Sequence, residues 1–105
     1  MPNGKMGKML KQIQKVQNEM MKMQEEVSGR TVEATSGGGA VRVVVSGAKE
    51  IKEIKIKPEV VDAEDVEMLE DLMLACINEA LRKADEMVAQ EMSRITGGMN
   101  IPGLF

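Results

Sequence analysis

The residues best placed to do chemistry are four lysines near the N-terminus, spaced three, four and seven positions apart. At about 100° per residue of helix, this spacing brings them onto one narrow stripe. An ammonium group makes compact contacts to phosphate oxygens, so such a stripe suits a nucleic-acid backbone. Surface lysine is also common on solvated helix faces, and the residues alone leave that alternative open. The lysine stripe consists of Lys8, Lys11, Lys15 and Lys22.

Charge is unevenly distributed along the chain. The net charge of −3 combines 14 basic and 17 acidic residues. Residues 1–30 are net +3, residues 31–57 are net +2 and residues 58–105 are net −8. The acidic total therefore hides a basic N-terminal half, which is a plausible footprint for phosphates. With a sequence pI of about 5.0, the signal is weak beside dedicated DNA-binding domains, whose pI often exceeds about 9.

The composition excludes most catalytic chemistry. The chain has no His, a single Cys (Cys76) and a single aromatic residue (Phe105). Without His there is no imidazole base, no histidine-activated nucleophile and no His ligand for zinc. One Cys forms no intrachain disulfide or CxxC pair, and one ring gives little for bases to stack on. We predict that the protein is not an enzyme and takes no cofactor and no small-molecule substrate.

Three other patterns have simpler structural explanations than a binding site. The Ser-Gly-Gly-Gly run at residues 36–39 lacks the P-loop pattern and precedes a strand, which favours a hairpin. The acidic residues between positions 64 and 71 lack an EF-hand loop, and they complement the dipole at a helix start. We predict no metal site there. Cys76 lies on an apolar helical face and is interpreted as a small buried hydrophobic residue.

The element that must position the lysines is a helix predicted over residues 5–29 and ended by Gly29. Its apolar residues alternate spacings of three and four, which is typical of a coiled-coil seam. Methionine-rich surfaces can also form adaptable binding grooves, but strict heptad spacing favours a packed helix interface. The lysine stripe lies roughly 145° from the middle of the seam and therefore faces outward. The seam consists of Met6, Met9, Ile13, Val16, Met20, Met23 and Val27.

The next segment predicts a β-hairpin. Residues 31–35 and 40–46 are rich in β-branched residues and flank the glycine run. Because side chains alternate along a strand, the apolar residues of both strands fall on one face. That face consists of Val32, Ala34, Val41, Val43 and Val45.

A third strand follows Gly47 and ends at Pro58. Ile54 and Ile56 alternate with charged residues, as a half-buried strand does. Ile51 breaks this alternation, which predicts a bulge near Lys52.

A second helix is predicted from Asp62 to about Ile95. Asp62 can cap its N-terminus, and the acidic first turns favour the helix dipole. Apolar residues at helical spacing define one face, formed by Leu69, Met73, Cys76, Ala80, Ala84 and Val88 and widened by Leu72, Ile77 and Leu81.

This order predicts a single α+β domain over residues 1–105, with flexible tails at 1–4 and 97–105. Its protomer is α-β-β-β-α, a small antiparallel sheet flanked by two long projecting helices. The helices would be roughly 37 and 50 Å long against strands of about 17–23 Å, so their ends project with apolar seams exposed. Those seams call for a second chain, most simply in a twofold homodimer. The residues predicted to mediate dimer and helix packing are Met9, Ile13, Val16, Met20, Val43, Val45 and Leu69.

The sequence also predicts a location. The N-terminal residues contain Gly and Lys and no apolar run of signal-peptide length. The longest apolar run, residues 72–77, is far shorter than the ~18 residues needed to span a bilayer. An unpaired Cys76 suits a reducing compartment. We expect a soluble cytoplasmic protein with no membrane partner.

Over nearly its whole length the chain resembles the YbaB/EbfC family of bacterial nucleoid-associated proteins. The resemblance rests on KMQEEV (22–27), VRVVVSG (41–47), IKI before Pro58, EMLEDL (67–72) and the closing SRITGGMNIPG (93–103). It implies a tweezer-like homodimer that forms through the sheet and binds double-stranded DNA in the bacterial nucleoid. It also implies effects on DNA conformation, nucleoid organisation and gene expression. The family has no catalytic motif to transfer.

DNA contact in relatives is associated with the helical arms, and charge assigns the candidates here. Lysine contacts phosphates, whereas base readout typically uses Arg, Asn or Gln, so we expect salt-sensitive and weakly sequence-selective binding. The alternative is a dimeric helical scaffold or adaptor that binds another protein. The DNA-binding candidates are Lys5, Lys8, Lys11, Lys15 and Lys22 on the first helix, and Arg82, Lys83 and Arg94 on the second.

Overall fold

The computed structural model describes residues 4–96 of the chain. Its sheet is antiparallel, with the strands in the order β1-β2-β3. This confirms the predicted α-β-β-β-α order, while the tails predicted to be flexible lie, apart from Gly4, outside the described residues. The elements are α1 (Gly4–Gly29), β1 (Thr31–Ser36), β2 (Val41–Ser46), β3 (Ile51–Ile56), a short 3₁₀ turn (Pro58–Val60) and α2 (Val66–Thr96).

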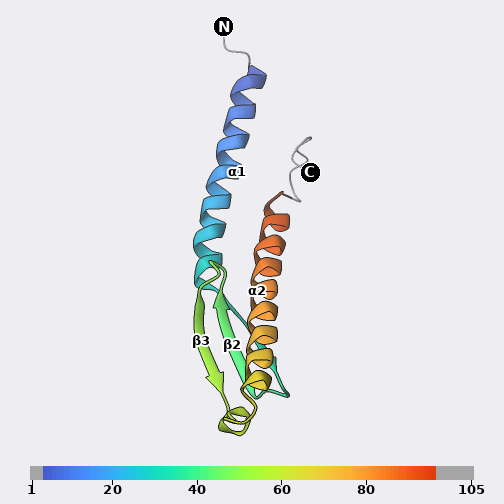
Figure 1. Ribbon diagram of the computed structural model, residues 1–105. Coiled ribbons are helices and arrows are strands. Elements are labelled where there is room, and N and C mark those ends of the chain that lie inside the picture. The colour runs from blue at the N-terminus through green and yellow to red at the C-terminus, as the bar shows by residue number, and fades with distance from the viewer. Residues whose placement is uncertain (1–3, 97–105) are drawn as a thin grey trace.

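The molecule is a rod of 77 × 22 × 17 Å. The sheet and the first half of α2 form its lower part, and α1 continues upward from the end of the sheet (Figure 1). The second half of α2 runs antiparallel to the C-terminal half of α1. The N-terminal half of α1 extends past the end of α2, so the predicted projection of long helices applies here to α1.

The glycine run forms the hairpin turn that the sequence predicts. Gly37, Gly38 and Gly39 have φ of +62°, +66° and +92°, which residues with a β-carbon rarely adopt. The turn brings Ser36 opposite Val41. The Ser36 hydroxyl also donates a hydrogen bond of 2.7 Å to a carbonyl of α2, which ties the hairpin to that helix.

The predicted bulge is confirmed at Lys52. Val44 pairs with Glu53 and Val45 pairs with Ile51, so Lys52 is the extra residue on β3. The bulge returns Ile51 to the same face of the sheet as Ile54 and Ile56.

The main core lies between α2 and the first two strands. Cys76, Ala80 and Ala84 form a row of small side chains that are at most 1% exposed. Small residues let the helix approach the sheet closely, and the Cys76 thiol lies 3.1 Å from the carbonyl oxygen of Ala34. Cys76 is thus buried, as predicted. The sheet residues in this core are Ala34, Val41, Val43 and Val45.

A second, smaller core joins the two helices. Met23 and Val27 of α1 pack with Met87 of α2, and all three are at most 7% exposed. The C-terminal part of the α1 seam is therefore covered by the α2 helix of the same chain.

The start of α2 differs from the prediction. The helix begins at Val66 rather than near Asp62. Asp65 provides the cap, since its carboxylate accepts a hydrogen bond from the Met68 amide at 3.2 Å. Asp62 instead closes a tight turn by accepting from the Glu64 amide at 2.9 Å, a geometry that competes with helix.

Candidate nucleic-acid interface

Three lysines of the stripe lie on the part of α1 beyond the end of α2. Lys8, Lys11 and Lys15 are exposed. Among residues 6–95, whose side chains the structure describes, none of the three has an ion-pair partner. Their charges are therefore available to an external anion. We call residues 6–18 the α1 arm, and Lys8, Lys11 and Lys15 the arm lysines.

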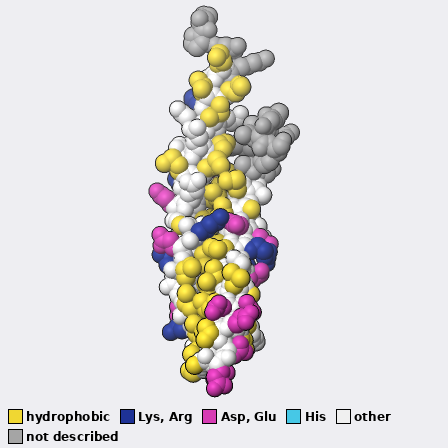
Figure 2. Space-filling view, viewed as in Figure 1, with side chains coloured by type: hydrophobic (Ala, Val, Ile, Leu, Met, Phe, Trp, Pro, Cys, Tyr) yellow, Lys and Arg dark blue, Asp and Glu magenta, His cyan; other side chains and the backbone are white. Residues whose placement is uncertain are grey.

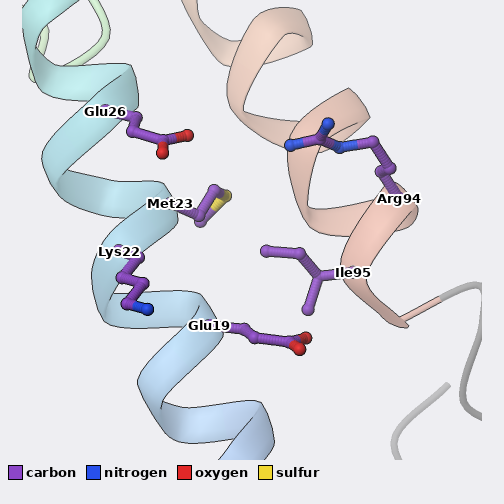
Figure 3. A pocket seen from close by; sticks show the side chains of 6 residues that line it. All are labelled: Glu19, Lys22, Met23, Glu26, Arg94 and Ile95. Atoms are coloured by element: carbon purple, nitrogen blue, oxygen red, sulfur yellow. The ribbon is translucent and has the colours of Figure 1, made fainter.

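The remaining two α1 candidates differ from the arm lysines. Lys5 belongs to α1, but its side chain lies outside the described part of the chain. Lys22 is exposed and lines an open cleft of about 390 Å³ between the two helices, together with Glu19 and Glu26. In Figure 3, Met23 of α1 and Ile95 of α2 point toward one another across this cleft. Two carboxylates near Lys22 make its surroundings less favourable to phosphate than those of the arm lysines.

The basic candidates of α2 are already bound to neighbouring groups. Arg82 lies 2.6 Å from both Glu79 and Glu86, and its hydrogen bonds to these carboxylates raise the pKa of the guanidinium. Lys83 donates to the carbonyl oxygen of Glu33 on β1 at 3.0 Å. The structure does not bring these side chains together with the arm lysines. Arg94 likewise forms an ion pair with Glu91, at 2.6 Å.

Basic side chains of the sheet region are paired in the same way. Arg42 forms ion pairs with Glu33 and Glu53, and the hydrogen bond to Glu33 is the main reason that its pKa is raised. The remaining pairs are Arg30 with Glu91, Lys49 with Asp85, Lys52 with Glu50 and Lys55 with Glu53.

An apolar surface that sequence reasoning missed lies on β3. Ile51, Ile54 and Ile56 pair with the core residues of β2 and share their face of the sheet, yet they are 47%, 43% and 38% exposed. The reason is that α2 packs over β1 and β2 and leaves β3 uncovered. Figure 2 shows apolar atoms gathered in the lower half of the molecule beside α2. We call these three isoleucines the β3 face.

The residues predicted to mediate dimer and helix packing fall into two groups. Val43 and Val45 are fully buried in the core of one protomer, and Leu69 packs against the same core. On α1, Val16 is buried and Met20 is half-buried, whereas Met9 and Ile13 are 61% and 48% exposed. Val43 and Val45 therefore pack within the chain, Met20 and Leu69 are partly exposed, and Met9 and Ile13 are the most exposed of the set.

The described residues contain neither a metal-binding cluster nor a membrane-spanning helix. No three Cys, Asp or Glu side chains among them are grouped so as to hold a metal ion. Neither described helix has the length and hydropathy needed to cross a bilayer.

The fold is similar to that of a solved structure. It resembles the crystal structure of an uncharacterised protein, HP0035, from Helicobacter pylori, with a TM-score of 0.63. The two chains are 20% identical, and the match covers 74% of this chain and 90% of that one.

The chain is much more similar in sequence to several proteins that are named nucleoid-associated protein. One from Pelotomaculum thermopropionicum is 59% identical over the full length of both chains. One from Acetivibrio thermocellus is 63% identical over 97% of this chain and 91% of its own. A sequence profile of the YbaB/EbfC DNA-binding family matches residues 2–99. The chain therefore belongs to the YbaB/EbfC DNA-binding family.

Proposed function

We propose that the protein binds double-stranded DNA as a homodimer, mainly through contacts between the arm lysines and phosphates. The observation that carries the proposal is a contrast within residues 6–95. Lys8, Lys11 and Lys15 have no carboxylate partner there, whereas most other basic residues form ion pairs, with Lys22, Lys57 and Lys83 as the exceptions. A paired arginine must lose its carboxylate before it can gain a phosphate. An unpaired lysine exchanges only water and counterions, and counterion release favours binding.

The geometry of the arm supports the same assignment. Residues 1–18 contain no acidic residue, and the uppermost turns of α1 show no acidic atoms on the face in Figure 2. At 1.5 Å per residue, Lys8 and Lys15 are separated by roughly 10 Å along the helix. Each strand of duplex DNA carries one phosphate charge per about 3.4 Å of helix axis, so one arm is long enough to contact two or more phosphates.

The β3 face supports the homodimer. Three partly exposed isoleucines in one row form an unusual surface for a monomer, and rows of this kind mark interaction sites. A twofold interface uses the same patch on both copies, and apolar side chains of one copy can pack against those of the other without unpaired polar groups. Two protomers joined at β3 would form the tweezer-like arrangement and double the number of arm lysines.

The proposed mode of contact determines how the protein binds and acts on DNA. Binding through phosphates is weakly sequence-selective and salt-dependent. A dimer with two arms can alter DNA conformation, organise the nucleoid and influence gene expression without catalysing a reaction. The named relatives are nucleoid-associated proteins, so we place this protein in the bacterial nucleoid as well.

The proposal is tested by titrating a fluorescent duplex at several salt concentrations with the wild type and a Lys8→Gln/Lys11→Gln/Lys15→Gln variant. The variant should bind more weakly across sequences. The slope of log affinity against log salt should become shallower by about 0.9 for each phosphate that the variant no longer neutralises.

A charge-matched variant provides the control. Lys49→Gln/Lys52→Gln/Lys55→Gln removes three positive charges that are already paired with carboxylates. It should retain most of the affinity and the salt slope. An equal loss in both variants would show that net charge matters and the arm does not. Absence of wild-type binding near 50 mM salt, where phosphate contacts are strong, would favour a scaffold or adaptor that docks a protein.

A further inference from the structure

The α1 arm carries an apolar surface that no described residue of α2 covers. Met6, Met9 and Ile13 of the seam are 64%, 61% and 48% exposed, and Leu10 beside them is 61% exposed. Further along the same seam, Met23 is 3% exposed because α2 packs on it. Helices in proteins gain most of their stability from packing an apolar face against the rest of the molecule. The first turns of the arm lack this packing, whereas the C-terminal half of α1 has it.

Along the seam, burial continues from Met23 to Val16, which is 8% exposed, and the exposed residues begin at Ile13. Ile95 of α2 faces Met23 of α1 across the cleft between the helices (Figure 3), and α2 ends at Thr96. The chain after Thr96 therefore continues from a helix end that lies beside the seam, on the side of the exposed residues.

The segment that follows has the composition of a partner for that seam. Residues 97–105 read GGMNIPGLF and have no charged side chain. Two glycines permit a change of chain direction, and Pro102 disfavours a further helix. Four large apolar residues follow the glycines: Met99, Ile101, Leu104 and Phe105.

The segment is also long enough. In extended form its nine residues span up to about 30 Å. Along α1, Ile13 and Met6 lie roughly 10 and 21 Å beyond Met20, which is half-buried near the end of α2. The segment can therefore reach every exposed residue of the seam.

Position in the chain favours residues 97–105 over a second α1 arm as the occupant. The segment is joined to the end of α2, so it meets the seam at a high effective concentration, whereas a second arm must come from another molecule.

We propose that residues 97–105 pack on the exposed seam of the α1 helix of their own chain. The arm lysines lie on the opposite side of the helix and stay exposed. The segment then supplies the tertiary packing that keeps the arm helical from residue 6 onward.

Hydrogen exchange on the full-length protein, without DNA, tests the proposal. In an Ile101→Asn/Leu104→Asn variant, backbone amides of residues 8–18 should exchange roughly tenfold faster, while those of the sheet should not change. Asn100→Ser, which changes a polar residue of the same segment, should leave exchange as in the wild type. Equal exchange of the arm amides in the double variant and the wild type would overturn the proposal.

Cross-linking distinguishes the possible occupants. With Cys76→Ala as background, Ile13→Cys and Leu104→Cys should form a disulfide that keeps the monomer mass under denaturing conditions. Gln14→Cys, on the far side of the helix, paired with Leu104→Cys should form it at least tenfold more slowly. A product at twice the monomer mass would assign the seam to a second copy and overturn the proposal. Neither measurement involves DNA, so the outcome is independent of the proposed function.

Discussion

Gly47 approaches Val27 so closely that a β-carbon on Gly47 would stand 2.1 Å from the Val27 carbonyl oxygen. The Gly47 amide also donates a hydrogen bond of 3.0 Å to the carbonyl oxygen of Arg30. The turn after β2 is thereby held against the C-terminal end of α1, and this contact orients the helix relative to the sheet. The direction of the α1 arm depends on it.

Gly47→Ala should therefore destabilise the protein, because the backbone of α1 must move to admit a methyl group. Overpacking of this kind costs about 1–3 kcal/mol in the free energy of unfolding. Urea denaturation at fixed protein concentration measures it. Gly29→Ala is the matched control, since a β-carbon there meets no atom within 4 Å. Equal stability of the Gly47→Ala variant and the wild type would contradict the close contact.

The row of small residues on α2 leads to a second prediction. Ala80 is fully buried between Cys76 and Ala84, in the core that α2 forms with β1 and β2. Ala80→Leu adds three carbons at this contact and should lower the free energy of unfolding by about 1–3 kcal/mol or more. Ala89→Leu, on an exposed position of the same helix, should change it by less than about 0.5 kcal/mol. Denaturant unfolding of both variants, at one protein concentration, separates overpacking from helix propensity.

The local features of this fold are predictable because each depends on near neighbours in the sequence. Heptad spacing places α1, the glycine run places the hairpin, and the broken alternation at Ile51 locates the bulge at Lys52. The predicted start of the second helix is wrong because Asp62 and Asp65 are both good caps, and only the turn that Asp62 closes decides between them.

The candidate site is harder to predict, because it depends on how elements meet. The alternation of side chains along a strand puts Ile54 on the same face of the sheet as Val43. The sequence does not reveal, however, that α2 covers β2 and leaves β3 uncovered. The ion pairs of Arg82 can be predicted from the sequence, since glutamates lie three residues before it and four residues after it. That spacing alone separates Arg82 from the arm lysines, because oppositely charged residues three or four positions apart are neighbours on a helix surface.

The β3 face gives a third prediction. Ile54→Asn places a polar side chain in the middle of the proposed dimer interface and should convert the homodimer into a monomer of 11.5 kDa at micromolar concentration. Lys55→Asn, on the neighbouring residue and the opposite face of β3, should remain a dimer. Static light scattering measures both masses. A wild-type protein at the monomer mass would refute the homodimer.

The ion pair of Glu79 with Arg82 predicts a pH dependence. The hydrogen bond from Arg82 lowers the pKa of Glu79 below its ordinary value of 4.5. A lowered pKa stabilises the folded state above about pH 4.5, and that contribution is lost as the pH falls through the lowered pKa. Glu79→Gln removes the contribution, so the variant should melt below the wild type at neutral pH. The difference in melting temperature should shrink toward zero in acid, and a difference that stays constant with pH would contradict the assignment.

Release of Arg82 gives the last prediction. Glu79→Gln/Glu86→Gln removes both carboxylates that hold the guanidinium, which leaves Arg82 able to contact a phosphate. If α2 lies within reach of the duplex, the variant should bind DNA more tightly, and its salt slope should steepen by about 0.9 for each additional phosphate that it neutralises.

Removing two acidic charges also raises the affinity for DNA by long-range attraction alone, so the control must match that change in net charge. Glu59→Gln/Glu64→Gln removes two exposed carboxylates that hold no arginine in the part of the chain the structure describes. Titration of one duplex across a salt series should show a steeper slope for the first variant only. Parallel slopes for the two variants would mean that Arg82 stays away from the phosphates and that DNA contact is confined to α1.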